Sequence, residues 1–392
     1  MAITINQAPK DYAPVYNKME YLLTSTNIAQ PNFSFVADIY INGAITYTRL
    51  FPQSRPSDGK GVVDIHRVLE ATLTSDLGDI TSILGVNATS NSSLSYVVKF
   101  GEQYGGTIYP DLTVDSTRYS INASLEKLEF INWDITDYNL DGTSKKFLTN
   151  APISQEVSID DYGWLYYKEA SGGALTGFVV TTYDSSGALI SAFEIDAALV
   201  GGLGYVACAP ASLNLIDNAN LLSGTQDIIT SSVASYTIQA RLGFAVFSEL
   251  RTFVIREDCK MEHNRLIFLN KLGGFDAFNF YLASNYSYQI EKKMMKVNAD
   301  TVVGNTIVDS LSDKEKVQYY TKQTPSLQLV SDWITEEEDS WLLELIESPE
   351  IYLQTANGLE SIAKVKGTSH KKRKHITDKL FNLTVDLELG YD

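Results

Sequence analysis

Short stretches of alternating apolar and polar residues recur along this chain, and this pattern restricts the fold more than any other feature. Residues 33–41 alternate with period two, Asn42-Gly43 follows as a type I′ turn signal, and residues 44–51 alternate again. The 23 tyrosines and 16 phenylalanines are residues that strands favour. These observations predict a mainly β fold.

The first section, residues 1–133, is predicted to be a β-sandwich domain with one short helix. The helix is expected to begin after Asp64 as the capping residue, because Ile65, Val68, Leu69 and Leu73 recur at helical spacing. Residues 95–100 are predicted to form a returning strand before the turn at Gly105-Gly106.

The second section, residues 134–255, is predicted to be another β-sandwich domain of immunoglobulin-like (Ig-like) type. A hairpin is expected from residues 177–183 and 188–195 across the turn at 184–187, with further strands at 236–241 and 248–256. Many short strands joined by turn signals are typical of a sandwich.

The third section, residues 256–392, is predicted to be a small α+β domain. Thr335 and Glu338 have the spacing of a capping box, which predicts a helix over residues 335–348 that ends before Pro349. Residues 379–390 alternate strongly and predict a C-terminal strand with one wet face.

The net charge of −17 argues against a nucleic-acid-binding protein, since such binding needs basic surface. The first residues show neither a basic nor an apolar signal region, and no apolar stretch is long enough to span a bilayer. We therefore expect synthesis in a cytoplasm, without export and without a membrane partner. Cys208 and Cys259 lack metal-ligand spacing; one disulfide between them or two buried thiols both remain open.

No catalytic signature is present in the sequence. The P-loop, nucleophile-elbow and dinucleotide-binding motifs are absent, and none of the histidines has a metal-ligand spacing (His66, His263, His370, His375). We expect a protein that is not an enzyme and that has no catalytic residues, no cofactor and no metal.

Two groups of residues are candidate binding sites. Trp164, Tyr166 and Tyr167 follow the acidic pair at 160–161, and aromatic faces beside carboxylates suit a glycan. The second group is electrostatic: a basic block could contact an acidic helix on an adjacent copy, although a solvated loop would also explain the block. The basic residues are Lys371, Lys372, Arg373 and Lys374, and the acidic ones are Glu336, Glu337, Glu338 and Asp339.

Several phrases of the sequence resemble virion structural proteins of tailed phages that infect Bacteroidetes bacteria. The phrases lie at residues 35–50, 61–73, 146–152, 265–280, 331–353 and 379–390, and include GVVDIHRVLEATL, KFLTNAP and RLIFLNKLGGFDAFNF. The resemblance implies a tail, neck or baseplate ring protein located in the virion. It supplies no catalytic residues.

Two hypotheses from different classes follow. The first is a non-enzymatic structural subunit of a tailed-phage particle, which forms a homo-oligomeric ring or collar and docks to other virion proteins. The alternative is a carbohydrate-binding host-recognition module, such as an adhesin or receptor-binding protein. Mass in solution and glycan affinity would distinguish them.

Overall fold

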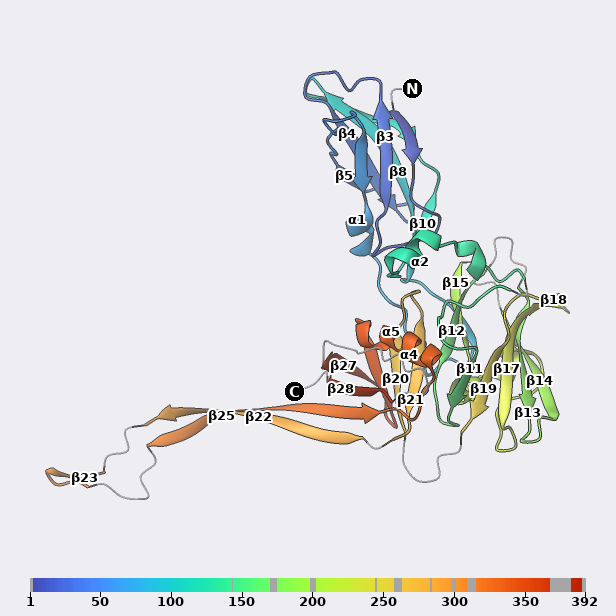
Figure 1. Ribbon diagram of the computed structural model, residues 1–392, viewed down its shortest axis with the longest axis vertical. Coiled ribbons are helices and arrows are strands. Elements are labelled where there is room, and N and C mark those ends of the chain that lie inside the picture. Colours follow the sequence, from blue (N-terminus) through green and yellow to red (C-terminus); the bar gives the residue numbers. More distant parts are fainter. Residues whose placement is uncertain are drawn as a thin grey trace. The chain divides into compact units, whose positions relative to one another are not determined.

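The computed structural model describes residues 3–142, 144–169, 175–197, 202–243, 245–256, 263–282, 284–297, 301–308, 315–366 and 382–389. The chain is mainly β and divides into two compact units (Figure 1). Unit 1 contains residues 1–257 and 267–277, and unit 2 contains residues 258–266 and 278–392.

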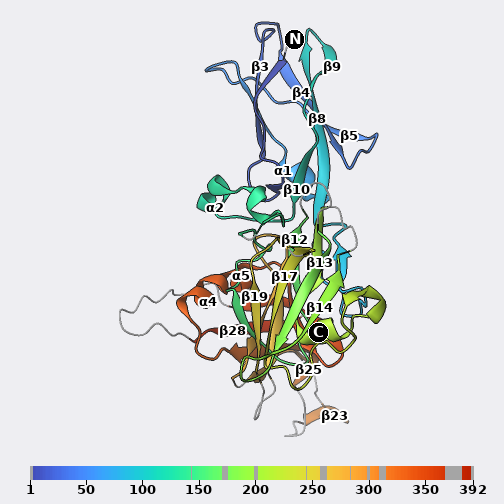
Figure 2. The same ribbon diagram turned by 90° about the vertical axis from the view of Figure 1, so that its right-hand side faces the viewer.

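The first sandwich of unit 1 is made by a three-stranded sheet and a six-stranded sheet (Figures 1 and 2). The first sheet has the order β1-β3-β6 (Ile3–Gln7, Glu20–Ser25, Gly61–Asp64). The second has the order β2-β10-β8-β4-β5, with β9 beside β8 (Ala13–Pro14, Arg118–Ile121, Ser93–Tyr104, Ser34–Ile41, Tyr47–Leu50, Thr107–Val114). Buried residues of both sheets share one core, including Tyr21, Leu23, Ile39 and Val98.

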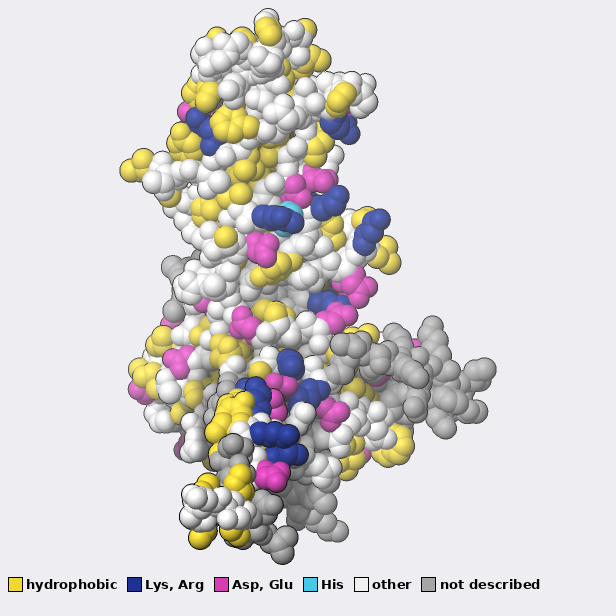
Figure 3. All heavy atoms as spheres, turned by 90° about the vertical axis from the view of Figure 1, so that its left-hand side faces the viewer, with side chains coloured by type: hydrophobic (Ala, Val, Ile, Leu, Met, Phe, Trp, Pro, Cys, Tyr) yellow, Lys and Arg dark blue, Asp and Glu magenta, His cyan; other side chains and the backbone are white. Residues whose placement is uncertain are grey.

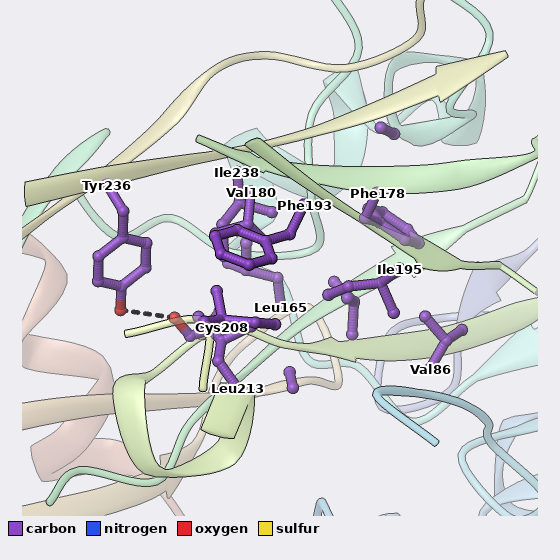
Figure 4. Packing of buried hydrophobic residues seen from close by; sticks show 14 of the residues in the cluster. Val86, Leu165, Phe178, Val180, Phe193, Ile195, Cys208, Leu213, Tyr236 and Ile238 are labelled. Carbon is purple, nitrogen blue, oxygen red and sulfur yellow. Dashed lines mark hydrogen bonds between the residues drawn. The ribbon is translucent and has the colours of Figure 1, made fainter. Parts of the chain in front are cut away.

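The second sandwich of unit 1 combines a seven-stranded and a three-stranded sheet. The larger has the order β11-β19-β17-β13-β14-β16, with β18 beside β17 (Ser154–Val157, Arg251–Ile255, Ser235–Leu242, Gly177–Tyr183, Leu189–Asp196, Leu221–Ser223, Ala245–Val246). The smaller has the order β12-β15-β7 (Trp164–Lys168, Leu203–Ala207, Val86–Ala88). Figure 4 shows Phe178 and Ile238 of the larger sheet in one cluster with Leu165 and Val86 of the smaller sheet. In the same cluster, the Tyr236 hydroxyl donates a hydrogen bond to the Cys208 carbonyl over 2.7 Å.

Short helices accompany the sheets of unit 1. They are α1 (His66–Glu70), α2 (Lys127–Asn132), α3 (Pro210–Asn214), and the 3-10 turns η1 (Ile135–Tyr138) and η2 (Asn218–Asn220).

Unit 2 contributes most of a seven-stranded sheet. The order is β21-β20-β26-β27-β28-β25-β22 (Phe275–Phe280, Asn264–Leu269, Ile351–Thr355, Gly358–Lys366, Thr384–Leu389, Lys316–Val330, Asn285–Lys296). A small hairpin of β23 (Thr301–Val303) and β24 (Thr306–Val308) lies between β22 and β25 in sequence. The helices α4 (Glu336–Trp341) and α5 (Leu343–Glu347) complete the unit, and Trp341 of α4 makes an edge contact with Phe278 at 6.0 Å between ring centroids.

Local sequence signals specify several of these elements as expected. Asn42 and Gly43 have φ values of 49° and 67°, as a type I′ turn requires. The returning strand expected at 44–51 is shorter: β5 covers residues 47–50, and residues 42–46 join it to β4. The expected strand at 95–100 lies within β8, and the expected hairpin at 177–195 is β13–β14.

The helix after Asp64 is shorter than its apolar spacing predicts. α1 has Ile65 as its N-cap residue, and Asp64 instead accepts hydrogen bonds from the backbone N–H groups of His66 and Met19, each over 3.2 Å. Ile65, Leu69 and Leu73 are buried as predicted. The Asp64 carboxylate therefore links the start of α1 to Met19, the residue directly before β3.

The helix expected at 335–348 is present as two short helices. Thr335 and Glu338 form the predicted capping box, but the helix is interrupted at Leu342, which separates α4 from α5. The last strand alternates as predicted: Leu383, Val385, Leu387 and Leu389 are buried, whereas residues 379–381 and 390 of the expected strand lie outside the described residues.

The compact units differ from the three sections expected from the sequence. Unit 1 includes both sandwiches, and β7 at residues 86–88 joins a sheet of the second sandwich, so the strands on either side of residue 133 are not kept apart. The first break between units follows residue 257, but residues 267–277 belong to unit 1. A separate α+β domain over 256–392 stays a prediction.

Candidate assembly surface

A long two-stranded hairpin of unit 2, formed by β22 and β25, is the most distinctive surface of the described chain; we call it the arm. The two strands pair from Asn285↔Gln328 to Lys296↔Lys316. Among the described residues, β25 pairs with β28 through 326–330, and residues 316–325 continue with β22 as their one described neighbour. At roughly 3.3 Å per residue, this part is about 33 Å long. Figure 1 shows β22 and β25 continuing past the other strands of their sheet.

One face of the arm is a continuation of the core of unit 2. Leu327 and Leu329 of β25 are buried opposite Leu387 and Val385 of β28. Because directly paired residues in an antiparallel sheet share a face, Tyr286 lies on the same face as Leu327, and Tyr288 and Ile290 follow at period two.

The apolar residues on this face are exposed along the arm. Tyr286, Tyr288 and Ile290 have 57%, 58% and 54% of their surface exposed. The other face is polar and carries the pairs Ser287↔Ser326, Gln289↔Thr324 and Glu291↔Lys322. The arm is therefore an amphipathic ribbon whose apolar side is open to solvent.

More exposed apolar residues lie farther along the arm and on the small hairpin. The pairing is irregular between Lys293 and Met294, and the exposed residues beyond this point include Met294, Met295 and Tyr319. On the β23–β24 hairpin the exposed residues are Val302, Val303, Ile307 and Val308. Exposed apolar residues gathered on neighbouring strands favour an interaction site in a folded protein.

The arm also has backbone edges without a strand neighbour among the described residues. β22 is the last strand of its sheet, and β25 has no partner other than β22 along residues 316–325. Such edges present backbone N–H and C=O groups to which another chain can hydrogen-bond.

The charge of the arm is opposite in sign to that of the whole chain. β22 and β25 carry five lysines and one glutamate, a net charge of +4, against −17 for the whole chain, which leaves −21 for the rest. Lys293 lies 3.7 Å from Glu291 and 5.0 Å from the centre of the Tyr320 ring. Figure 3 views this side of the chain and shows hydrophobic side chains next to Lys or Arg side chains, with acidic side chains beside them.

Only part of the predicted acidic contact surface is accessible. Asp339 is buried, and the Glu338 carboxylate accepts hydrogen bonds from the backbone N–H and hydroxyl of Thr335 over 2.7 and 2.9 Å. Glu336 and Glu337 are exposed, close in sequence to the exposed Trp333. The basic residues Lys371, Lys372, Arg373 and Lys374 lie outside the described residues.

The predicted glycan-contact residues are buried, which corrects the sequence-based expectation. Trp164, Tyr166 and Tyr167 are 5%, 3% and 0% exposed, because β12 is buried on both faces. The Trp164 ring is packed against Gly78, where an added Cβ would lie 2.0 Å from a ring atom, and the Tyr166 hydroxyl donates to the Asp76 carbonyl over 2.6 Å. Burial raises the pKa of Tyr166 well above its usual value. A sugar needs an open ring face, which these residues do not present.

The titratable residues singled out in the sequence are dispersed. His66 Nδ1 lies 2.9 Å from Asp64, and the His263 ring lies 5.7 Å from that of Tyr281. Asp161 is buried and accepts from the Ser158 N–H over 2.7 Å. Cys208 is buried, whereas Cys259, His370 and His375 fall in undescribed segments. Within the described ranges, no three His, Cys, Asp or Glu residues are placed to hold a metal ion.

Among the helices that the structure describes, none has the length and apolar character needed to span a bilayer.

Comparisons with known proteins give no family assignment. No protein-family model and no curated protein matches the chain. Similar solved structures include the FN1–FN3 domains of chicken CNTN1, with 11% identity over 64% of this chain and 69% of that chain, at a TM-score of 0.17. Titin-A168169 has 8% identity over 66% of this chain and 100% of that chain, at a TM-score of 0.21. CBD12 from CALX1.2 has 9% identity over 61% of this chain and 93% of that chain, at a TM-score of 0.17. At these TM-scores the similarities carry no argument, so the mainly β assignment rests on the sheets themselves.

Proposed function

We propose that this chain is a non-enzymatic structural subunit of a tailed-phage particle. It forms a ring or collar in the tail, neck or baseplate by self-association and docks to neighbouring virion proteins. The observation that carries the proposal is the arm, whose open apolar face includes Tyr286, Tyr288 and Ile290 on a hairpin built from two long strands. The sequence resemblance to virion structural proteins supports the same class.

The physical argument is that this exposed surface needs a partner. A two-stranded hairpin is marginally stable in water on its own, and a large exposed apolar patch is costly unless another protein covers it. Specific protein interfaces bury on the order of 1,000 Å² or more, which an arm of this length can supply together with its open strand edges. The arm therefore favours an assembly role over a soluble monomer.

No observation favours the carbohydrate-binding alternative. The aromatic residues on which it depended, Trp164, Tyr166 and Tyr167, are buried in the second sandwich. We therefore keep assembly as the single proposed function.

The test is to measure the mass of the purified full chain by light scattering and mass photometry over a wide concentration range, with negative-stain microscopy of the same samples. Phage particles grown from a genome that encodes the chain are then analysed by mass spectrometry and by labelling with antibodies against it. We expect a closed oligomer and a fixed copy number in purified particles. A chain that stays monomeric at every concentration and is missing from purified particles would contradict the proposal.

A further inference from the structure

We propose that the arm of one copy docks on the acidic body of a second copy of this chain, and so links neighbouring subunits. The body is the described chain outside the arm, the small β23–β24 hairpin and the residues around them. This inference rests on the proposed self-assembly and identifies the part of the chain that carries it.

The first argument is the continuity of the apolar face. Leu329 and Leu327 are buried in unit 2, and the same face continues through Tyr286, Tyr288 and Ile290 with more than half of each side chain exposed. In a solitary protein, alternation of this kind is expected only where a core covers the apolar side. The arm therefore has the alternating sequence of a strand pair whose apolar face is buried against another protein surface. In this proposal, that surface belongs to another subunit.

The second argument is charge. The arm strands carry +4, while all other residues of the sequence together, those of the small hairpin and of the undescribed segments included, carry −21. Two arms brought together would repel each other, whereas an arm and a body attract, and opposite charge favours encounter and correct orientation. Lys292 lies on the apolar face directly after Ile290, opposite Thr321, so this face combines apolar and cationic contacts. A second copy of the acidic chain is the partner that this combination fits.

The third argument is geometric and concerns why the arm does not cover itself. β25 is one strand of 15 residues, paired with β22 from Lys316 to Gln328. A paired ribbon of this kind is stiff compared with a loop, and about 33 Å of it lies beyond the last pair with β28. The exposed apolar face therefore lies beyond the part of the sheet where β25 also pairs with β28, and the core of unit 2 does not cover it. Because arm and body are different surfaces, repeated contacts are head-to-tail and build a ring when the rotation closes.

The main test compares two double variants of the full-length chain. Tyr288→Ser with Ile290→Ser removes the apolar side chains, and Ser287→Ala with Gln289→Ser changes the opposite face of the same strand as a matched control. Circular dichroism and thermal unfolding establish that both fold. We expect the first variant to associate at least about 10-fold more weakly in mass photometry, which corresponds to about 1.4 kcal/mol, and the control to assemble like the unmodified chain.

The charge argument has its own test. We expect Lys292→Glu on the apolar face to weaken association, and we expect association of the unmodified chain to weaken as NaCl rises from about 50 to about 500 mM, because salt screens exposed charges. Association that is stronger in the reversed-charge variant would overturn the acidic body as the receiving surface.

The partner itself is identified by cross-linking. A photo-reactive phenylalanine analogue replaces Tyr288 in a mixture of ¹⁴N- and ¹⁵N-labelled copies, so that cross-links between copies are recognised by mixed isotope labels. Arm-to-body links between differently labelled copies support the proposal, whereas arm-to-arm links or links within one copy alone overturn it. Oligomers that persist unchanged in Tyr288→Ser with Ile290→Ser would refute this inference and leave the proposed function standing. A chain that never associates, or whose arm captures only a different virion protein, would also refute it.

Discussion

At the scale of residues, a partly buried polar network holds together three segments of the first sandwich. The Tyr21 hydroxyl and Arg118 Nε donate to Asp115 Oδ2 over 2.8 and 2.6 Å, and Arg118 Nη1 donates to the Pro9 carbonyl over 2.8 Å. Burial alone would raise the pKa of Asp115, but the hydrogen bonds from Arg118 and Tyr21 and the Arg118 charge outweigh it and lower this pKa. Asp115 therefore stabilises the fold in its ionised form.

This lowered pKa gives a pH-dependent prediction. A carboxylate whose pKa is lower in the folded protein contributes stability above its unfolded pKa of about 3.9, and the contribution is lost as pH falls through the folded pKa below that value. We expect Asp115→Asn to reduce the free energy of unfolding by about 1–3 kcal/mol at pH 7. Urea unfolding at several pH values should show the difference shrinking below about pH 4. A difference independent of pH would contradict this role of Asp115.

At the scale of elements, the sequence predicts those parts whose residues interact locally. The Asn42-Gly43 turn, the Thr335–Glu338 capping box and the alternation from Leu383 to Leu389 are each encoded within a few residues, and each is present. Turn geometry and helix caps depend on neighbouring backbone groups, so no distant partner is needed to specify them.

The parts that sequence reasoning missed depend on distant contacts. Residues 286, 288 and 290 show the period-two pattern of a strand, but the pattern cannot indicate whether anything covers its apolar side. The same limit applies to β12, where Trp164 and Tyr167 were expected at a surface and are buried from both sides. The pairing of β7 with β15 joins residues more than 100 positions apart, which local alternation does not encode.

The capping box at the start of α4 gives a prediction for this element. The Thr335 hydroxyl accepts from the Glu338 N–H over 3.2 Å, and the Glu338 carboxylate accepts from the Thr335 N–H over 2.7 Å. We expect Thr335→Ala to lower the free energy of unfolding by about 1 kcal/mol, because one backbone donor at the helix start loses its partner. The matched control is Ser361→Ala at an exposed strand position, which should change stability by less than about 0.5 kcal/mol. Equal effects of the two substitutions in urea unfolding would argue against the cap.

At the scale of the whole molecule, the chain builds several cores instead of one. The two sandwiches of unit 1 have separate clusters of buried residues, one around Val98 and Tyr21 and the other around Ile238 and Phe178. Each cluster is enclosed by its own pair of sheets. Since local stability follows the contacts that a region makes, the two sandwiches are expected to open as distinct cooperative units.

This organisation predicts where the effect of a core substitution will be felt. Ile238→Ala and Val98→Ala each remove buried methyl groups from a different cluster, and a large-to-small change of this kind costs about 1–5 kcal/mol. We expect Ile238→Ala to speed hydrogen exchange mainly in β13, β14 and β17, and Val98→Ala mainly in β3, β4 and β8. Exchange measured peptide by peptide by mass spectrometry checks the pattern, with the unmodified chain as reference. If either substitution accelerated exchange equally in both sandwiches, the clusters would form one cooperative core and the division drawn from their contacts would be wrong. A selective response instead means that each sandwich keeps its own fold when the core of the other is damaged.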